Sequence, residues 1–242
     1  MSTNNLAEFL AGAHVAAEVF ELRPDYRAFL MVVDGLPTGP SNDLSENLLQ
    51  EAEASAREKF QKQPIAEFPH VAAWRTAYKA FGAKPQKYRN SLEALTRRVE
   101  TGGLPRVNRL TDIYNAISVK YQLPFGGEDL DKYHGSPRCI RATGQENFEV
   151  TASGATVIEH PDAGEVVWCD EGGVTCRRWN WRQGPRTALT DSTTRALFII
   201  DILDPITDDV VDAAVAELTS ALRQLNPDIV VETRKISNPS RQ

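Results

Sequence analysis

The spacing of apolar residues predicts helices mainly in the first half of the chain and strands mainly in the second half. Apolar residues recur at helical intervals in residues 6–19, 45–63, 71–81, 91–100, 111–122 and 210–225. Short apolar runs closed by turn residues predict strands at residues 26–33, 139–142, 149–151, 166–169, 174–181, 196–202 and 228–233. This order favours an α+β fold with a mixed or antiparallel sheet over a regular βαβ fold.

Polar residues that precede the helical segments are the expected helix caps. We expect Ser45 and Ser91 to cap their helices, and either Asn108 or Thr111 to cap the helix that runs to Gln122. The caps place the start of this last helix within a polar stretch of the chain.

The composition is typical of a globular protein, with 41% hydrophobic and 25% charged residues among 242. No repeat or linker divides the sequence, so residues 1–236 are expected to form one domain before a disordered tail of residues 237–242. No apolar run approaches the roughly 18 residues of a membrane helix, and the N-terminal residues lack the basic start of a signal peptide. The three cysteines are too few and odd in number for a disulfide framework. We therefore expect a cytoplasmic protein without a membrane partner.

Positive charge is concentrated in one segment of an acidic chain. The formal net charge is −6, yet residues 70–110 contain nine Lys or Arg and only two Glu. A local basic face on an acidic protein can bind phosphates while it limits non-specific binding. The alternative is a solvated helical surface that has no partner.

Common catalytic and cofactor motifs are absent from the sequence. It has no G-x-S-x-G, no Walker phosphate loop and no G-x-G-x-x-G. Its four histidines include no pair at helical metal-ligand spacing, and no Cys-x-x-Cys occurs. We therefore expect no metal site and no cofactor.

Residues 104–131 (LPRVNRLTDIYNAISVKYQLPFGGEDLD) combine a capped helix, a double glycine and acidic residues. Asn115 lies among apolar residues, so its amide either ties down a neighbouring loop or orients a polar ligand. Gly126 and Gly127 either form a helix-to-strand turn or present two successive N–H groups to an oxyanion or carbonyl.

Residues 176–183 (CRRWNWRQ) combine arginine with tryptophan. In a strand, one face carries Arg178, Asn180 and Arg182. The other face carries Arg177, Trp179 and Trp181. Aromatic rings stack on bases and guanidinium groups hold phosphates, so the segment suits a terminal nucleotide. Alternatively, the tryptophans belong to the core and the arginines to its rim.

These segments resemble the B3/B4 editing domain of the bacterial phenylalanyl-tRNA synthetase β chain, and more closely the free-standing B3/B4 domain proteins. The synthetase pattern R-P-I-N-x-V-V-D-V-T-N-Y-V-x-L-E-x-x-Q-P-x-H-A-F-D-x-D is similar to residues 104–131 without a gap. The segments AWRTAYKAFGAKPQKYRNSLEAL, GEVVWCD, CRRWNWRQ and TDSTTRALFIIDIL resemble the free-standing group. The resemblance covers about residues 26–225. It implies a trans-acting deacylase that releases a wrongly attached amino acid from the 3′ end of tRNA.

The resemblance also implies pocket residues, two of which are altered here. The family's Thr-Asn pair falls on Tyr114 and Asn115, and its pocket histidine falls on Gly126. A pocket glutamate corresponds most nearly to Asp201. Since the histidine is replaced by glycine, it cannot be an essential base in this protein. The reshaped pocket need not accept tyrosine, the residue that the synthetase domain rejects, and our hypothesis is a small or polar, threonine- or serine-like amino acid.

The expected site therefore has three parts. The expected catalytic residues, which place water and stabilise the oxyanion, are Asn115, Gly126 and Gly127. The expected substrate contacts are Tyr114, Phe125, Asn180 and Asp201. The expected contacts with the tRNA acceptor end are Lys84, Lys87, Arg89, Arg109, Arg178, Trp179 and Arg182. The alternatives are a non-catalytic tRNA- or RNA-binding module with the same fold, and a small-molecule enzyme that acts on amino acids or nucleotides.

Overall fold

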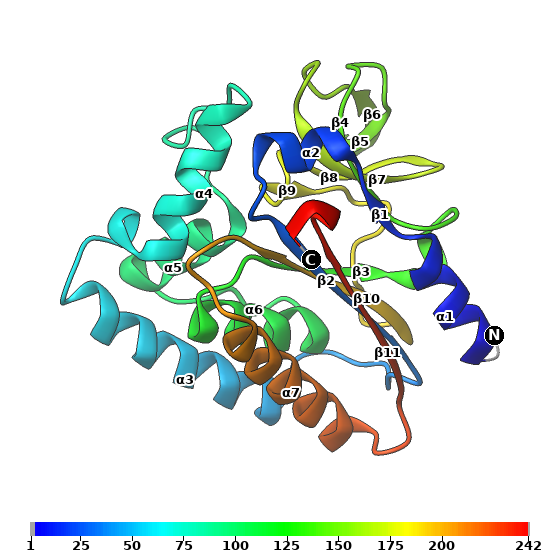
Figure 1. Ribbon diagram of the computed structural model, residues 1–242. Helices are drawn as coiled ribbons and strands as arrows, with labels where there is room; N and C mark the ends of the chain where they lie inside the picture. Colours follow the sequence, from blue (N-terminus) through cyan, green and yellow to red (C-terminus); the bar gives the residue numbers. More distant parts are fainter. Residues whose placement is uncertain (1–2, 242) are drawn as a thin grey trace.

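A four-stranded antiparallel sheet in the order β11-β2-β10-β3 forms the centre of the molecule (Figure 1). The computed structural model describes residues 3–241. The strands of this central sheet are β2 (Arg27–Asp34), β3 (Phe125–Asp129), β10 (Arg195–Ile202) and β11 (Val230–Ser237). Strands β2 and β10 are apolar throughout their middles because both of their faces are covered, whereas β3 is an edge strand.

Helices cover one face of the central sheet. They are α3 (Asp43–Phe60), α6 (Arg109–Tyr121) and α7 (Asp208–Leu225), which lie together below the sheet in Figure 1. Side chains that alternate along the strands, such as Met31 and Phe198, pack against apolar residues of α6 and α7. Helix α6 is therefore buried along most of its length.

A second sheet covers the opposite face. It has the order β1-β4-β7-β8-β9, and only its β1–β4 pair is parallel. Its strands are β1 (His14–Val15), β4 (Arg138–Arg141), β7 (Val166–Asp170), β8 (Gly173–Arg177) and β9 (Arg182–Gln183). Helices α1 (Thr3–Gly12), α2 (Ala17–Leu22) and α4 (Pro69–Ala80) complete this layer. The core between the layers contains Trp74, Trp168 and Trp179, all fully buried.

The remaining elements lie around these layers. They are α5 (Ser91–Thr101), the β5–β6 hairpin (Phe148–Ala152 and Ala155–Glu159) and the 3-10 helices η1 (Ile65–Glu67), η2 (Leu130–Lys132) and η3 (Pro239–Arg241). Gln242, the end of the tail predicted to be disordered, lies outside the described residues. In the described part of the chain, none of the helices combines the length and apolarity that membrane crossing requires.

The predicted α+β fold is confirmed, with helices mainly in the first half and strands mainly in the second. Of the two predicted caps of α6, Asn108 is the one found, since its side chain accepts a hydrogen bond from the backbone of Thr111. The other two caps differ from the prediction. Asn42 caps α3 and Ser45 completes its capping box, while Asn90 rather than Ser91 caps α5.

Three predicted elements are wrong in ways that matter for the site. The helix predicted at residues 6–19 is divided, because β1 leaves it to pair with β4. The strand predicted at residues 174–181 ends at Arg177, because Arg178 and Trp179 both have positive φ and form a turn. The helix-to-strand turn, one of the two interpretations of the double glycine, is not formed, because both glycines lie within β3.

A buried carboxylate fixes α5 beside α4. Glu93 is fully buried, and its oxygens accept hydrogen bonds from Arg75 at 2.8 and 3.0 Å and from Arg97 at 3.0 Å. Removal of one partner from a buried ion pair is strongly destabilising, because the other charge stays partly desolvated.

We expect Glu93→Gln to lower the free energy of unfolding by about 3 kcal/mol. Urea unfolding followed by circular dichroism measures the change. Glu100→Gln is the matched control, because Glu100 lies exposed on the same helix and should change stability by less than about 0.5 kcal/mol. Equal stability of the two variants would contradict the role given to Glu93.

Candidate functional site

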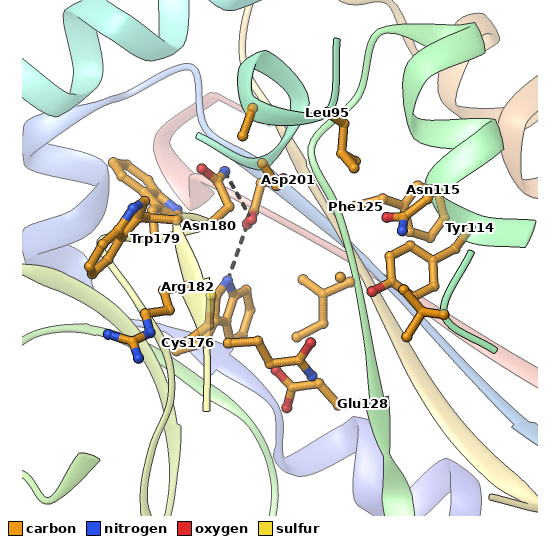
Figure 2. A pocket seen from close by; sticks show the side chains of 18 of the residues that line it. Leu95, Tyr114, Asn115, Phe125, Glu128, Cys176, Trp179, Asn180, Arg182 and Asp201 are labelled. Carbon is orange, nitrogen blue, oxygen red and sulfur yellow. Dashed lines mark hydrogen bonds between the residues drawn. The ribbon is translucent and has the colours of Figure 1, made fainter. Parts of the chain in front are cut away.

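A cavity of about 410 Å³ lies where α5, the start of α6 and the edge strand β3 meet the second sheet (Figure 2). Of the expected catalytic and substrate residues, the structure brings six together in its lining, namely Tyr114, Asn115, Phe125, Gly126, Asn180 and Asp201. Leu95 of α5 and Ile199 of β10 add apolar walls. A concave, largely apolar space with a few polar groups is the usual form of a small-molecule site.

The pairing of β3 with β10 builds the floor of this cavity. Gly126 lies opposite Ile199 and Glu128 lies opposite Leu197, so these side chains share the face toward the second sheet. Asp201 is on the same face, two residues beyond Ile199. A Cβ atom at Gly126 would meet no other atom within 4 Å, so this glycine leaves the middle of the floor open.

Asp201 lies at one end of the floor in a network of neutral donors. Its oxygens accept hydrogen bonds from the Tyr26 hydroxyl at 2.5 Å, from Trp168 Nε1 at 3.2 Å and from Asn180 Nδ2 at 3.2 Å. Figure 2 shows Asp201 and Asn180 pointing toward one another. Burial raises the pKa of Asp201 to about 6, although the three donors favour its ionised form. A ligand cation at this end would complete the stabilisation of the carboxylate.

Glu128 lies at the opposite end of the floor, as Figure 2 shows. Its carboxyl group accepts a hydrogen bond from the Tyr133 hydroxyl, and only 3% of the residue is exposed. Burial raises the pKa of Glu128 to about 7, and the nearby Asp170 carboxylate adds to the increase. The carboxyl group is therefore able to exchange a proton near neutral pH.

Asn115 presents an amide to the cavity. Only 7% of the residue is exposed, it lines the cavity, and its side chain makes no hydrogen bond with another described residue. Buried amides are normally hydrogen-bonded, so an amide held without a protein partner is suited to a ligand or water. The neighbouring Tyr114 instead stacks on Phe125, with ring centroids 6.0 Å apart.

The two glycines have different roles, and the expected pair of free N–H groups is not formed. N–H directions alternate along a strand, so Gly126 points its N–H toward β10, while Gly127 points its peptide groups to the free edge. The Gly127 carbonyl accepts a hydrogen bond from Gln183 Nε2 at 2.8 Å on that edge. A Cβ atom at Gly127 would lie 2.6 Å from the Tyr114 ring and 2.8 Å from Leu189, so a larger residue here would require these side chains to move.

The mouth of the cavity carries two arginines. Arg98 and Arg182 line it, are exposed, and form no ion pair with any carboxylate in residues 3–241. Trp181, which is half-buried, lines the cavity beside them. Two free guanidinium groups beside an indole ring are suited to a phosphate and a base.

Two other residues of the predicted nucleotide-binding segment are engaged elsewhere. Trp179 is fully buried in the core, so its ring contributes a cavity wall and is not an open stacking surface. Arg178 is 5% exposed, contacts Glu165 at 3.5 Å and stacks on the Tyr88 ring at 3.7 Å. The turn at these residues causes both differences, because it ends the strand alternation that the prediction assumed.

The basic segment 70–110 is less free than its charge suggests. Arg75 and Arg97 pair with Glu93, Arg106 pairs with Glu46 and Glu53, and Arg109 donates to the carbonyl of Pro40. The predicted contacts Lys84, Lys87 and Arg89 are exposed but lie outside the cavity lining. Their role in phosphate binding stays a prediction.

The expected set of site residues did not include Arg98, Glu128, Trp168 and Trp181, which also line the cavity. Glu128 follows the double glycine, and the interpretation of that pair as a turn removed the alternation that places Gly126 and Glu128 on one face. Within residues 3–241, no cluster of histidine, cysteine and carboxylate side chains could hold a metal ion.

Comparisons with known proteins identify a matching family model and a similar solved structure. The family model described as the B3/4 domain matches residues 73–227, and no curated protein sequence matches. A solved N-terminal fragment of the phenylalanyl-tRNA synthetase β-subunit from Pyrococcus horikoshii is similar over 92% of this chain, with 13% identity and a TM-score of 0.46. This chain spans 50% of that fragment.

The raised pKa values predict how stability depends on pH. The folded protein keeps protons on Glu128 and Asp201 at pH values where the unfolded chain has lost them, so the free energy of unfolding should fall as pH rises from about 4.5 to 7. Glu128 alone should contribute about 3 kcal/mol to this fall. His70, whose pKa burial lowers to about 4, acts in the opposite direction.

Urea unfolding of wild type and Glu128→Gln at pH 5 and pH 8 isolates the glutamate, because His70 contributes equally in both proteins. The variant should lose less stability than wild type between these pH values. The same loss in both would show that Glu128 titrates normally.

Proposed function

Because the chain belongs to the B3/4 domain family, we propose that it is a trans-acting aminoacyl-tRNA deacylase. It would hydrolyse the ester between a non-cognate amino acid and the terminal ribose of tRNA. The observation that carries this proposal is the unpartnered amide of Asn115, which faces a cavity with a buried carboxyl group at each end and free arginines at its mouth. We propose a small or polar amino acid, threonine- or serine-like, as the one released.

The binding mode follows from the distribution of charge. The arginines Arg98 and Arg182 would hold phosphates of the tRNA 3′ end, and Trp181 would stack on a terminal base. Asp201 would accept hydrogen bonds from the α-ammonium group, since a cation offsets the desolvation of this carboxylate. The aminoacyl group would then lie along the floor over Gly126.

The reaction needs little acid–base chemistry because an aminoacyl ester is already activated. The Asn115 amide would orient the attacking water, and a ribose hydroxyl of the tRNA would help to activate it. The Gly127 N–H, which faces away from β10, would stabilise the developing oxyanion. The Gly126 N–H would not, because it points into the β3–β10 ladder.

The second candidate function is a tRNA-binding module without hydrolysis. The Gly126 N–H points toward β10 and is not free to bind an oxyanion, so the site has one oxyanion donor instead of two. This favours the non-catalytic module. Incubation of the protein with a panel of charged tRNAs separates the two functions. Release of one amino acid supports the deacylase, and binding without release supports the module.

Asn115→Ala should reduce deacylation of the best substrate about 100- to 1000-fold, the usual effect of losing a donor that acts on the transition state. Single-turnover release of labelled amino acid measures it. The fold should be retained, since the Asn115 side chain has no hydrogen bond with the described residues to lose.

Asn42→Ala is the matched control. It removes the cap of α3 and so lowers stability by about 1 kcal/mol, but Asn42 lies outside the cavity lining. Its activity should equal that of wild type. Near-normal turnover by Asn115→Ala would remove Asn115 from the catalytic assignment.

Binding of tRNA should weaken steeply with salt, because phosphate contacts release counterions. Arg98→Gln and Arg182→Gln should each lower the slope of log affinity against log salt by about 1. Fluorescence anisotropy with labelled tRNA at several salt concentrations measures the slopes. Arg223→Gln, an exposed arginine on α7, is the control, and an equal change in this control would contradict the role of the cavity mouth.

A further inference from the structure

Two buried carboxyl groups face the same cavity from its opposite ends. Glu128 lies opposite Leu197 on the neighbouring strand, and Asp201 is four residues further along that strand. With about 3.3 Å per residue along the strand and about 4.8 Å between the strands, the backbone positions of the two acids are about 14 Å apart. Gly126 and Ile199 lie between them, so the floor has an acidic group at each end and no polar side chain in its middle.

The surroundings of Glu128 leave its charge uncompensated. Within residues 3–241, no Lys, Arg or His forms an ion pair with it. Its partners are neutral hydroxyl groups, chiefly that of Tyr133. A structural carboxylate in a core is usually matched by a cation, as Glu93 is by Arg75 and Arg97. Glu128 faces the cavity instead.

We propose that Glu128 is a specificity-determining residue that accepts a hydrogen bond from the side chain of the released amino acid. The substrate side chain therefore carries a donor, either a hydroxyl or an ammonium group. This inference rests on the proposed deacylase function. It deepens that function, because Asp201 then binds the α-ammonium group and Glu128 reads the other end of the same aminoacyl group.

Rejection of apolar side chains follows from the same geometry. An apolar group placed against Glu128 would exclude water from the carboxyl group and offer no hydrogen bond in return. Sites built to hydrogen-bond a substrate group reject analogues that lack it much more strongly than apolar pockets reject an added methylene. The preference should therefore appear between side chains of nearly equal size.

The test compares release rates for tRNAs charged with matched pairs of amino acids: serine and alanine, threonine and valine, tyrosine and phenylalanine, lysine and methionine. In the pair whose side chains have the size that the cavity accepts, wild type should release the donor-bearing amino acid at least about 100-fold faster than its apolar partner. Glu128→Leu should reduce this ratio below about 10-fold. Damage to the fold would slow both members alike and leave the ratio unchanged.

Three variants complete the test. Glu128→Met has nearly the same length but no carboxyl or amide oxygen, so it covers the case in which the leucine variant fails to fold. Glu128→Gln keeps an acceptor oxygen and nearly the same volume. It should retain release of a hydroxyl substrate and lose release of an ammonium substrate, which distinguishes the two donors. Val119→Ala, a buried change among the residues that pack on α3, is the control and should leave the ratio as in wild type.

The experiment distinguishes a failure of the Glu128 inference from a failure of the proposed deacylase function. A wild-type protein that releases amino acids without preference within pairs, or a preference that Glu128→Leu or Glu128→Met retains in full, would overturn this inference and leave the deacylase function standing. If wild type releases no amino acid from any charged tRNA, the proposed function and this inference both fail.

Discussion

The antiparallel pairing of β3 with β10 is the constraint on which the rest of the site depends. It fixes which residues of a five-residue edge strand face the second sheet and which face α6. Gly126 and Glu128 are thereby placed over the cavity, while Gly127 is pressed against the Tyr114 ring. A shift of this register by one residue would exchange these roles and close the cavity.

Burial gives the site its chemistry. Asp201 and Glu128 are both buried, and burial raises the pKa values of these two carboxyl groups to about 6 and about 7. The free arginines lie only at the mouth, where they are exposed. This separation of an acidic interior from a basic rim suits a ligand with a cationic end and a phosphate-bearing end, which an aminoacylated nucleotide combines.

Much of the fold could be predicted from the sequence, because its main elements have strong local patterns. The apolar runs of β2 and β10 and the capped amphipathic α6 lie close to their predicted positions. Strand β3 could not be predicted in this way, since Gly126 and Gly127 have low strand propensity and become a strand only by pairing with β10. The turn at Arg178 and Trp179 likewise depends on core packing of the indole and on the contacts of the guanidinium.

Site residues could be predicted where the element that carries them was predicted correctly. Asn115 and Asp201 were identified by resemblance and lie in the cavity, because α6 and β10 are where the patterns placed them. Glu128 was missed because the alternation of β3 was missed. Arg178 was predicted as a nucleotide contact because a sequence shows where charged residues occur but not which groups they contact. In the structure, Arg178 contacts Glu165 and the rings of Tyr88 and Trp181.

The central claim is that this cavity receives the aminoacyl end of a tRNA. A crystal structure of the protein with a non-hydrolysable 3′-aminoacylamino-3′-deoxyadenosine tests it most directly. The account predicts an α-ammonium group at Asp201, a carbonyl group beside the N–H of Gly127, and the adenosine at the mouth near Trp181. An analogue bound with its aminoacyl group in solvent, or outside the cavity, would contradict the account.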